Sequence, residues 1–182
     1  MTTLGGQDAL LFTSTDFLSG SGFTGIAADS GFTEFVVGRL TTLGGPAVLR
    51  FAHELGTAGG VNTGFSLFWY SDVNGSNPAQ SMTFRVEPPA PIDVGYAFTD
   101  TTNPHIWTMQ HITAGRSLSE DGTGRVSNVS AHATDAITQH RVGLSLAGTL
   151  PWVGEIAEII TYARSLDLDE LARVHDYLGA RY

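Results

Sequence analysis

Short apolar runs recur along the chain and alternate with turn residues. In the run 82–86, Met82, Phe84 and Val86 are apolar and the residues between them are polar, which predicts a strand with one buried face. The run 65–70 is almost continuously apolar, which is typical of a central strand covered on both faces. Strands are expected at 9–12, 32–40, 47–53, 64–70, 81–86, 94–99, 106–112, 125–132, 140–146 and 154–162. Short strands between Gly-, Pro-, Asn- and Ser-rich turns predict an all-β sandwich or jelly roll.

The end of the chain predicts one helix after the last strand. Asp167 is placed to cap this helix by accepting a hydrogen bond from the backbone N–H of Glu170, whose carboxylate reaches back. Leu166 and Leu171 occupy the two positions of a hydrophobic staple. An apolar stripe continues at helical spacing through Leu171, Val174 and Leu178. The pattern predicts a helix at about 168–179.

This C-terminal segment resembles the signature of laminin-G-like jelly rolls, in the concanavalin A-like lectin and glucanase superfamily. In that signature a Gly-x-Ile-x-Glu strand ends in Tyr and leads through Arg-x-Leu-Asp into a short helix that ends in Tyr-Leu. The matching positions are Gly154, Ile156, Glu158, Tyr162, Arg164, Leu166, Asp167, Glu170, Val174, Tyr177 and Leu178. Ala157 and Thr161 depart from the signature. Weaker similarities lie at 9–18, 32–39 and 106–112.

The resemblance implies a two-sheet antiparallel jelly-roll sandwich with a short C-terminal helix. At 182 residues, the chain has the length of one ordinary domain. We therefore expect a single laminin-G-like domain over residues 1–182, with its closing strand at about 154–162.

The net charge of the chain argues against some classes of binding partner. The formal net charge is -9, from 18 acidic and 9 basic residues, and every basic residue is Arg. Such a surface repels phosphate backbones and anionic lipids, which argues against nucleic-acid and membrane partners. The N-terminal residues lack the basic and apolar regions of a secretion signal, and no run has membrane-spanning length.

The leading functional hypothesis combines this resemblance with the lack of an export signal. Laminin-G-like modules are usually parts of exported proteins, and release within a phage-like particle is another route out of the cell. We expect a virion surface component, such as a head decoration, head spike or tail-fibre module. Its partners would be other virion proteins, copies of itself and cell-surface polysaccharide. The alternatives are a stand-alone glycan-binding protein or glycoside hydrolase, and an assembly protein without a ligand.

Catalysis is not expected. Some relatives of this fold carry two catalytic acids on one strand, and both must face the scissile bond. Glu155 and Glu158 are three residues apart, which places them on opposite faces of a regular strand. We therefore predict no catalytic residues.

No bound metal is expected either, although calcium stays open as an alternative. Asp72 begins an oxygen-rich turn at 72–77, but calcium usually takes six to eight oxygens and several carboxylates. Further oxygens could come from neighbouring loops, at Asp100, Asn103, Glu120 and Asp121. The histidines at 53, 105, 111, 132, 140 and 175 show no His-x-x-x-His spacing, which argues against zinc.

Aromatic and oxygen-bearing residues near strand ends are the candidates for sugar contact. An aromatic ring stacks on the apolar face of a pyranose, and nearby Asp and Asn side chains accept hydrogen bonds from its hydroxyls. The candidates are Tyr70, Asp72, Asn74, Tyr96 and Trp152. For the aromatic residues, packing in the core is the competing interpretation.

Overall fold

The computed structural model describes residues 1–21, 26–28, 30–45, 48–57, 64–73, 77–87, 92–112, 114–129 and 134–182. Within these ranges the elements are β1 (Thr2–Leu4), β2 (Gln7–Phe12), β3 (Leu18–Ser21), β4 (Phe32–Leu40), β5 (Leu49–Gly56), β6 (Phe65–Tyr70), β7 (Ser81–Val86), β8 (Ile92–Ala97), β9 (His105–Ile112), β10 (Gly115–Glu120), β11 (Thr123–Asn128), β12 (Gln139–Val142), β13 (Gly154–Tyr162) and α1 (Leu168–Arg181).

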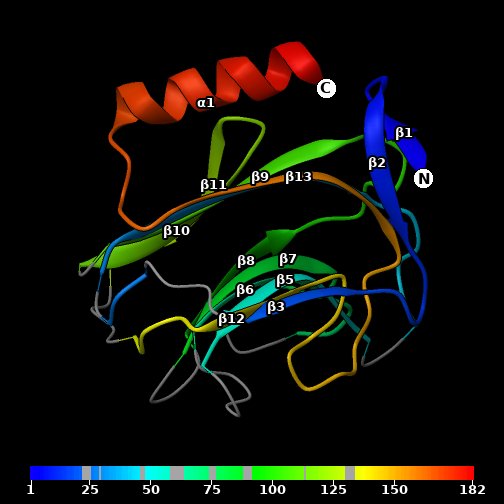
Figure 1. Cartoon of the computed structure of the whole chain (residues 1–182), viewed down its shortest axis with the longest axis horizontal. Helices are drawn as coiled ribbons and strands as arrows, with labels where there is room; N and C mark the ends of the chain where they lie inside the picture. Colours follow the sequence, from blue (N-terminus) through cyan, green and yellow to red (C-terminus); the bar gives the residue numbers. More distant parts are fainter. Residues whose placement is uncertain are drawn as a thin grey trace.

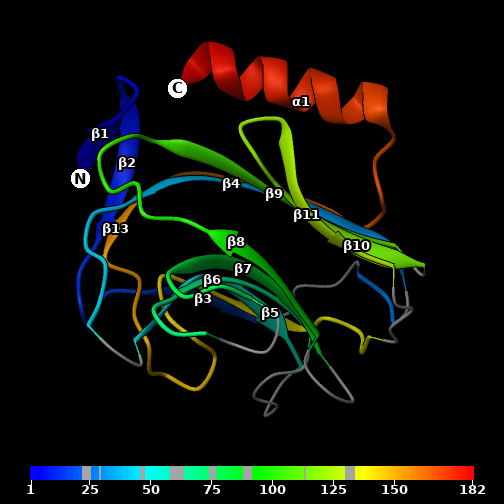
Figure 2. The same ribbon diagram turned by 180° about the vertical axis from the view of Figure 1, so that it is seen from behind.

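The strands form two stacked antiparallel sheets, with α1 on the outer side of one of them (Figures 1 and 2). The seven-stranded sheet has the order β1-β2-β13-β4-β9-β10-β11, and the six-stranded sheet has the order β3-β12-β5-β6-β7-β8. Neighbouring strands pair antiparallel, with register shifts in the β10–β11, β13–β4 and β5–β6 pairs. The predicted all-β sandwich with a short C-terminal helix is confirmed.

The core lies between the two sheets and consists largely of aromatic side chains. Phe32 of β4 stacks on Phe65 of β6, with ring centroids 4.2 Å apart, and so links the two sheets directly. Trp69, Trp107 and Trp152 are fully buried around this contact. Large rings bury the most apolar area for each residue, so they supply much of the packing energy of the sandwich.

The helix α1 covers a second apolar layer on the outer face of the seven-stranded sheet. Phe35 and Val37 of β4 point to this face and form a cluster with Leu166 and Leu178. Strand β4 is therefore buried on both faces, in agreement with its apolar sequence. Asp167 accepts from the backbone N–H of Glu170 at 2.9 Å, and the Glu170 carboxylate accepts from the backbone N–H of Asp167. The predicted capping box is present, and α1 extends two residues beyond the predicted range.

Several strand predictions need correction. Strands β1, β3 and β10 were not expected, because the segments Thr2–Leu4, Leu18–Ser21 and Gly115–Glu120 contain few apolar residues. The run predicted at 140–146 is a shorter strand, β12, because Gly143 has a positive φ of 81° and the chain leaves the sheet there. Of the run predicted at 125–132, residues 130–132 lie outside the described residues.

In the part of the chain that the structure describes, no helix combines the length and apolar character needed to cross a bilayer.

Candidate functional site

A groove lined by both apolar and polar side chains runs between α1 and the outer face of β9, β10 and β11; we call it the α1 groove. Two adjoining hollows, of about 490 Å³ and 390 Å³, share the side chains of His175 and Asp176. Figure 2 shows the β10–β11 hairpin reaching toward the helix beside this space. The polar residues that line the groove are His105, Thr108, Gln110, Ser117, Ser119, Asp121, His175, Asp176 and Tyr182.

The register of β9 and β10 places the floor of the groove on one face. Thr108 pairs with Ser119, and Gln110 pairs with Ser117. Side chains of paired residues point to the same side of a sheet. The floor therefore presents three hydroxyls and one amide toward α1, while the intervening Met109 faces the core.

Hydrogen bonds fix the wall that α1 contributes. The His175 ring lies with Nε2 3.1 Å from the Thr108 hydroxyl oxygen, and burial lowers the pKa of His175. The Gln110 amide donates to the Ser165 hydroxyl at 2.8 Å and to the Leu166 carbonyl at 2.6 Å. The groove is thus a preformed surface with hydroxyl, amide, imidazole and carboxylate groups.

A cluster of ionisable side chains lies at one end of the α1 groove; we call it the His105 cluster. His105 begins β9, Glu120 ends β10, and Asp121 with Gly122 forms the two-residue turn of the β10–β11 hairpin. Both turn residues have positive φ, 50° at Asp121 and 75° at Gly122, as a type I′ hairpin requires. This turn holds the Asp121 carboxylate beside His105.

The imidazole of His105 contacts three acids. Its Nδ1 lies 3.2 Å from Glu120 Oε1 and 3.0 Å from Asp121 Oδ2, and its Nε2 lies 3.4 Å from Asp100 Oδ2. Burial lowers the pKa of His105, but the hydrogen bond to Asp121 and the charges of the acids outweigh it, so the pKa is raised overall.

The acids of the cluster are themselves held in place. Asp100 accepts hydrogen bonds from the side chain and backbone of Asn103 and of Thr102, which hold its pKa well below the usual range. Burial opposes ionisation of Asp121, but the hydrogen bond from His105 and the backbone N–H of Ile106 lower its pKa overall. The sequence suggests three acids as possible oxygen ligands of calcium: Asp100, Glu120 and Asp121. All three thus lie around His105.

The predicted sugar-contact residues do not form one site. The ring of Tyr96 borders the His105 cluster, with the guanidinium of Arg125 5.7 Å from its centroid and its hydroxyl buried. Tyr70 ends β6 and Asp72 lies in the following turn, and both are half-buried. Asn74 lies outside the described residues.

Trp152 needs a correction. Its side chain is fully buried, and its ring packs edge-on against Trp107 with centroids 6.0 Å apart. The ring has no face that a sugar could reach, so the structure places Trp152 in the core.

A second charged cluster, absent from our sequence-based expectations, crosses the outer face of the six-stranded sheet; we call it the charge row. Cross-strand pairing aligns Arg141, Glu54, Ser66, Arg85 and Asp93 on five neighbouring strands. The charges alternate in sign along the row. Arg85 donates to both oxygens of Asp93, at 2.7 Å and 2.8 Å.

Glu54 of the charge row is buried, as is the neighbouring Glu87. Burial raises the pKa of Glu54, and it raises the pKa of Glu87 to about 7. Glu54 also accepts from the backbone N–H of Leu146 at 2.6 Å, and Arg85 lies 3.4 Å from Glu87. This cluster is an internal network of ion pairs.

The two acids considered for catalysis, Glu155 and Glu158, have separate structural partners. Glu155 is buried and accepts two hydrogen bonds from Arg39, at 2.6 Å and 2.8 Å. Glu158 accepts from the hydroxyl of Tyr182 at 3.0 Å.

Two histidines belong to the interior rather than to the α1 groove. His53 on β5 lies with Nδ1 2.9 Å from Glu34 on β4, which links the two sheets, and its Nε2 is 3.4 Å from His140.

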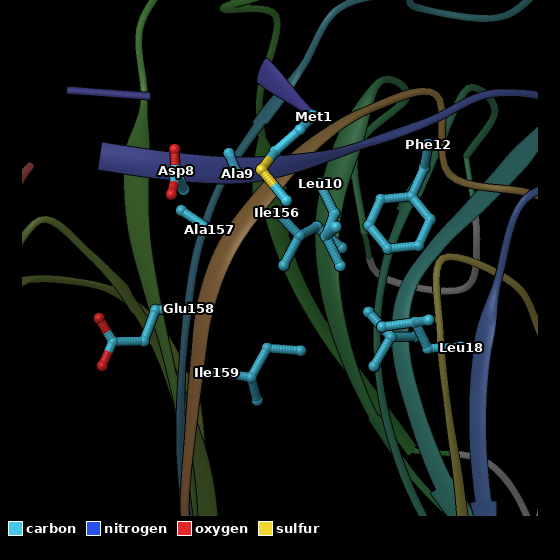
Figure 3. Close-up of a pocket in the computed structure, with 11 residues that line it drawn as sticks. Met1, Asp8, Ala9, Leu10, Phe12, Leu18, Ile156, Ala157, Glu158 and Ile159 are labelled. Carbon is cyan, nitrogen blue, oxygen red and sulfur yellow. The ribbon is translucent and has the colours of Figure 1, made fainter. Parts of the chain in front are cut away.

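Another hollow is apolar. It has a volume of about 280 Å³ and lies where the two sheets part beside β2 and β13. Figure 3 shows the hydrocarbon side chains of Leu10, Phe12, Leu18, Ile156 and Ile159 around it, with the carboxylates of Asp8 and Glu158 toward one side. Its lining suits an apolar group, in contrast to the hydroxyl-bearing α1 groove.

Comparison with known proteins supports the fold. A scan against models of protein families finds no match, and a search of curated protein sequences finds none. Among solved structures, a heptameric SAP-like pentraxin from Limulus polyphemus aligns with a TM-score of 0.65 and 11% identity, over 91% of this chain and 80% of the pentraxin chain.

Two botulinum neurotoxin structures are also similar. One is of type C, whose cell entry depends on interaction with two ganglioside molecules (TM-score 0.61, 8% identity). The other is a binding domain of neurotoxin DC in complex with rat synaptotagmin II (TM-score 0.61, 9% identity). Each alignment covers 82% of this chain, which spans only 36% of the neurotoxin chain. These likenesses, at low identity, show a shared jelly-roll sandwich fold.

Proposed function

We propose that this chain is a non-enzymatic carbohydrate-binding domain whose ligand lies in the α1 groove. The observation that carries this proposal is the groove itself, in which three hydroxyls face the imidazole and carboxylate of His175 and Asp176. Sugars present dense arrays of hydroxyls, and such ligands are bound by a few placed polar groups in a concave site.

The similar structures support the same class of ligand. The type C neurotoxin interacts with gangliosides, and a binding domain of neurotoxin DC has been solved in complex with SialylT. The fold is therefore compatible with glycan recognition. The site in this chain is argued from its own side chains.

The test is a glycan array with the purified protein, followed by titration calorimetry on the sugars that bind. Ser119→Tyr places a ring in the groove, and we expect it to weaken binding about tenfold or more, which corresponds to about 1.4 kcal/mol. The matched control, Ser14→Tyr, changes an exposed serine in the loop before β3 and should bind as the parent does.

Three results would overturn the proposal. Binding that is unaffected by Ser119→Tyr but lost in Tyr70→Ala would move the site to the end of β6. A failure to bind any glycan would reject the ligand class, and release of reducing sugar from a bound glycan would reject the non-enzymatic role.

For the biological setting, we propose display on the surface of a phage or phage-like particle, where the domain contacts other particle proteins and copies of itself. The support is the open edges of the two sheets, at β1 and β11 and at β3 and β8, which neighbouring proteins or copies of the chain can cover in a symmetric assembly. Immunogold labelling of particles from the source with antibody against this chain tests the setting. Unlabelled particles would contradict it.

A further inference from the structure

Three donor atoms of the His105 cluster face one another at the surface end of the β9–β10 pair. They are His105 Nδ1, Glu120 Oε1 and Asp121 Oδ2, and all three lie within 4.8 Å of one another. They come from the start of one strand, the end of the next and the hairpin turn beyond it. The rigid antiparallel register therefore fixes their relative positions.

The other oxygen of each carboxylate has its own hydrogen-bond donor. Glu120 Oε2 lies 2.6 Å from Arg125 Nη2, and Asp121 Oδ1 accepts from the backbone N–H of Ile106 at 2.8 Å. These bonds orient the carboxylates so that their remaining oxygens point at His105 Nδ1. Hydrogen bonds of this kind, which aim ligand atoms, are typical of metal sites.

The far side of the imidazole is also suited to metal binding. His105 Nε2 is buried and has no hydrogen-bond partner among the described residues, yet Asp100 Oδ2 lies only 3.4 Å away. An imidazole that binds a metal through one nitrogen commonly directs its other N–H at a carboxylate, which fixes the tautomer.

The distances match the geometry of a small cation with tetrahedral ligands. Metal–ligand bonds of about 2.0 Å to histidine nitrogen and carboxylate oxygen place neighbouring ligand atoms about 3.3 Å apart. The observed separations from His105 Nδ1 are 3.2 Å to Glu120 and 3.0 Å to Asp121. Half of the Asp121 side chain, 49%, is exposed and it lines the α1 groove, so solvent reaches the position of a fourth ligand.

We propose that His105, Glu120 and Asp121 form a binding site for a divalent transition-metal ion of the zinc class. The donor set does not fit calcium, which takes six to eight oxygen ligands and not an imidazole nitrogen. The inference stands apart from the proposed sugar binding, because it rests only on the three donor atoms and the groups that orient them.

The competing account is a protonated His105 that forms ion pairs with the same acids. The two accounts differ in what happens when metal is added. An ion pair needs no metal, whereas a site of this kind binds one ion for each chain and gives tetrahedral cobalt(II) its characteristic intense visible absorption.

The experiment uses the full chain after treatment with a chelator. Zinc(II) is titrated by calorimetry and cobalt(II) by visible absorption, each with excess calcium as a competitor. We expect saturable binding of one ion for each chain, no displacement by calcium and a tetrahedral cobalt spectrum. Asp121→Asn should weaken zinc binding about 100-fold, and Asp100→Asn about tenfold through the orientation of His105.

The matched control is Asp169→Asn, which changes an exposed acid in the first turn of α1, away from the donor set, and should leave zinc affinity unchanged. The variant His105→Gln removes the nitrogen ligand of the site. If it does not fold, two measurements still decide the question: zinc binding by Asp121→Asn, and the zinc-dependent shift of the His105 imidazole nitrogens in NMR spectra. Zinc binding that is absent, or equal in the parent and Asp121→Asn, would overturn the proposal. Displacement of zinc by calcium would overturn the assigned metal class.

Discussion

Acids and cations gather in two regions of this molecule, and the two regions differ in their access to water. In the His105 cluster Glu120 is only 6% exposed, but 49% of the Asp121 side chain is exposed, and hydrogen bonds stabilise the charge of Asp121. In and beside the charge row on the other sheet, Glu54 and Glu87 are only 5% and 4% exposed. The same residue types therefore face opposite electrostatic conditions within one sandwich.

The difference separates a surface that can bind a ligand from a network that only affects stability. A partly exposed carboxylate stays ionised and can exchange its hydration for a ligand. A buried carboxylate is held by its ion-pair partners, and loss of one partner leaves an uncompensated charge. We therefore expect substitutions in the charge row to change stability most, and substitutions in the His105 cluster to change binding most.

The largest effect is expected from Arg85→Met. Arg85 donates to both oxygens of Asp93, lies 3.4 Å from Glu87 and stacks 4.9 Å from the Phe68 ring centroid. Its loss leaves buried acids without their cation, so the free energy of unfolding in urea at pH 8 should fall by about 3–5 kcal/mol.

The control for this variant is Arg164→Met. Arg164 also donates to a carboxylate, that of Glu170, but these side chains are 56% and 33% exposed. Exposed pairs contribute little to stability because water screens their charges, so this variant should lose far less stability than Arg85→Met. Equal losses in the two variants would contradict the distinction between the regions.

A smaller, pH-dependent effect is expected from Glu87→Gln. Burial and the neighbouring acids raise the pKa of Glu87 from its ordinary 4.5 to about 7, so the folded chain holds this proton more tightly than the unfolded chain. Ionisation of Glu87 therefore lowers stability progressively between about pH 4.5 and pH 7, and fully above pH 7. Glutamine does not ionise, so the variant should gain about 1–2 kcal/mol over the parent at pH 8 and nothing at pH 4.5.

Thermal unfolding of both proteins across this pH range measures the difference. Glu170→Gln is the matched comparison, because the pKa of Glu170 is shifted in the opposite direction. Hydrogen bonds from Arg164 lower it to about 2. That variant should lose stability at neutral pH. A gain for Glu87→Gln that does not depend on pH would show that Glu87 is already neutral or well solvated.

The sequence predicted the elements whose signals are local. The end of the chain is the best example, because the capping box of Asp167 and Glu170 and the apolar stripe of α1 lie within a few residues of one another. Strand β10 was not predicted, because Leu118 is its one large apolar residue and its neighbours Arg116, Ser117 and Ser119 are polar. The Asp121–Gly122 turn was the available signal, since this dipeptide favours a tight hairpin.

The charged sites depend on register, which the sequence does not display. Glu120 reaches His105 because β10 pairs with β9 so that Glu120 lies opposite Trp107. The charge row likewise exists because Arg85 lies opposite Asp93. Trp152 shows the opposite kind of error, in which a buried residue was predicted to be a surface residue. Its position near a strand end suggested exposure, but that strand end lies inside the sandwich.

The smallest effect is expected at the opposite end of α1 from the His105 cluster. Asp167→Ala removes the helix cap, whose side chain accepts from the backbone N–H of Glu170, and should lower the free energy of unfolding by about 1 kcal/mol. For a chain of this length the melting temperature should fall by about 2–4 °C. Faster hydrogen exchange in the first helical turn would locate the loss.

Asp169→Ala, in the same turn but outside the capping box, is the control and should lose less than half as much stability. Because His175 and Asp176 lie two turns further along the helix, zinc binding should not change. A loss of zinc affinity in Asp167→Ala would mean that the whole helix, and not only its first turn, depends on the cap.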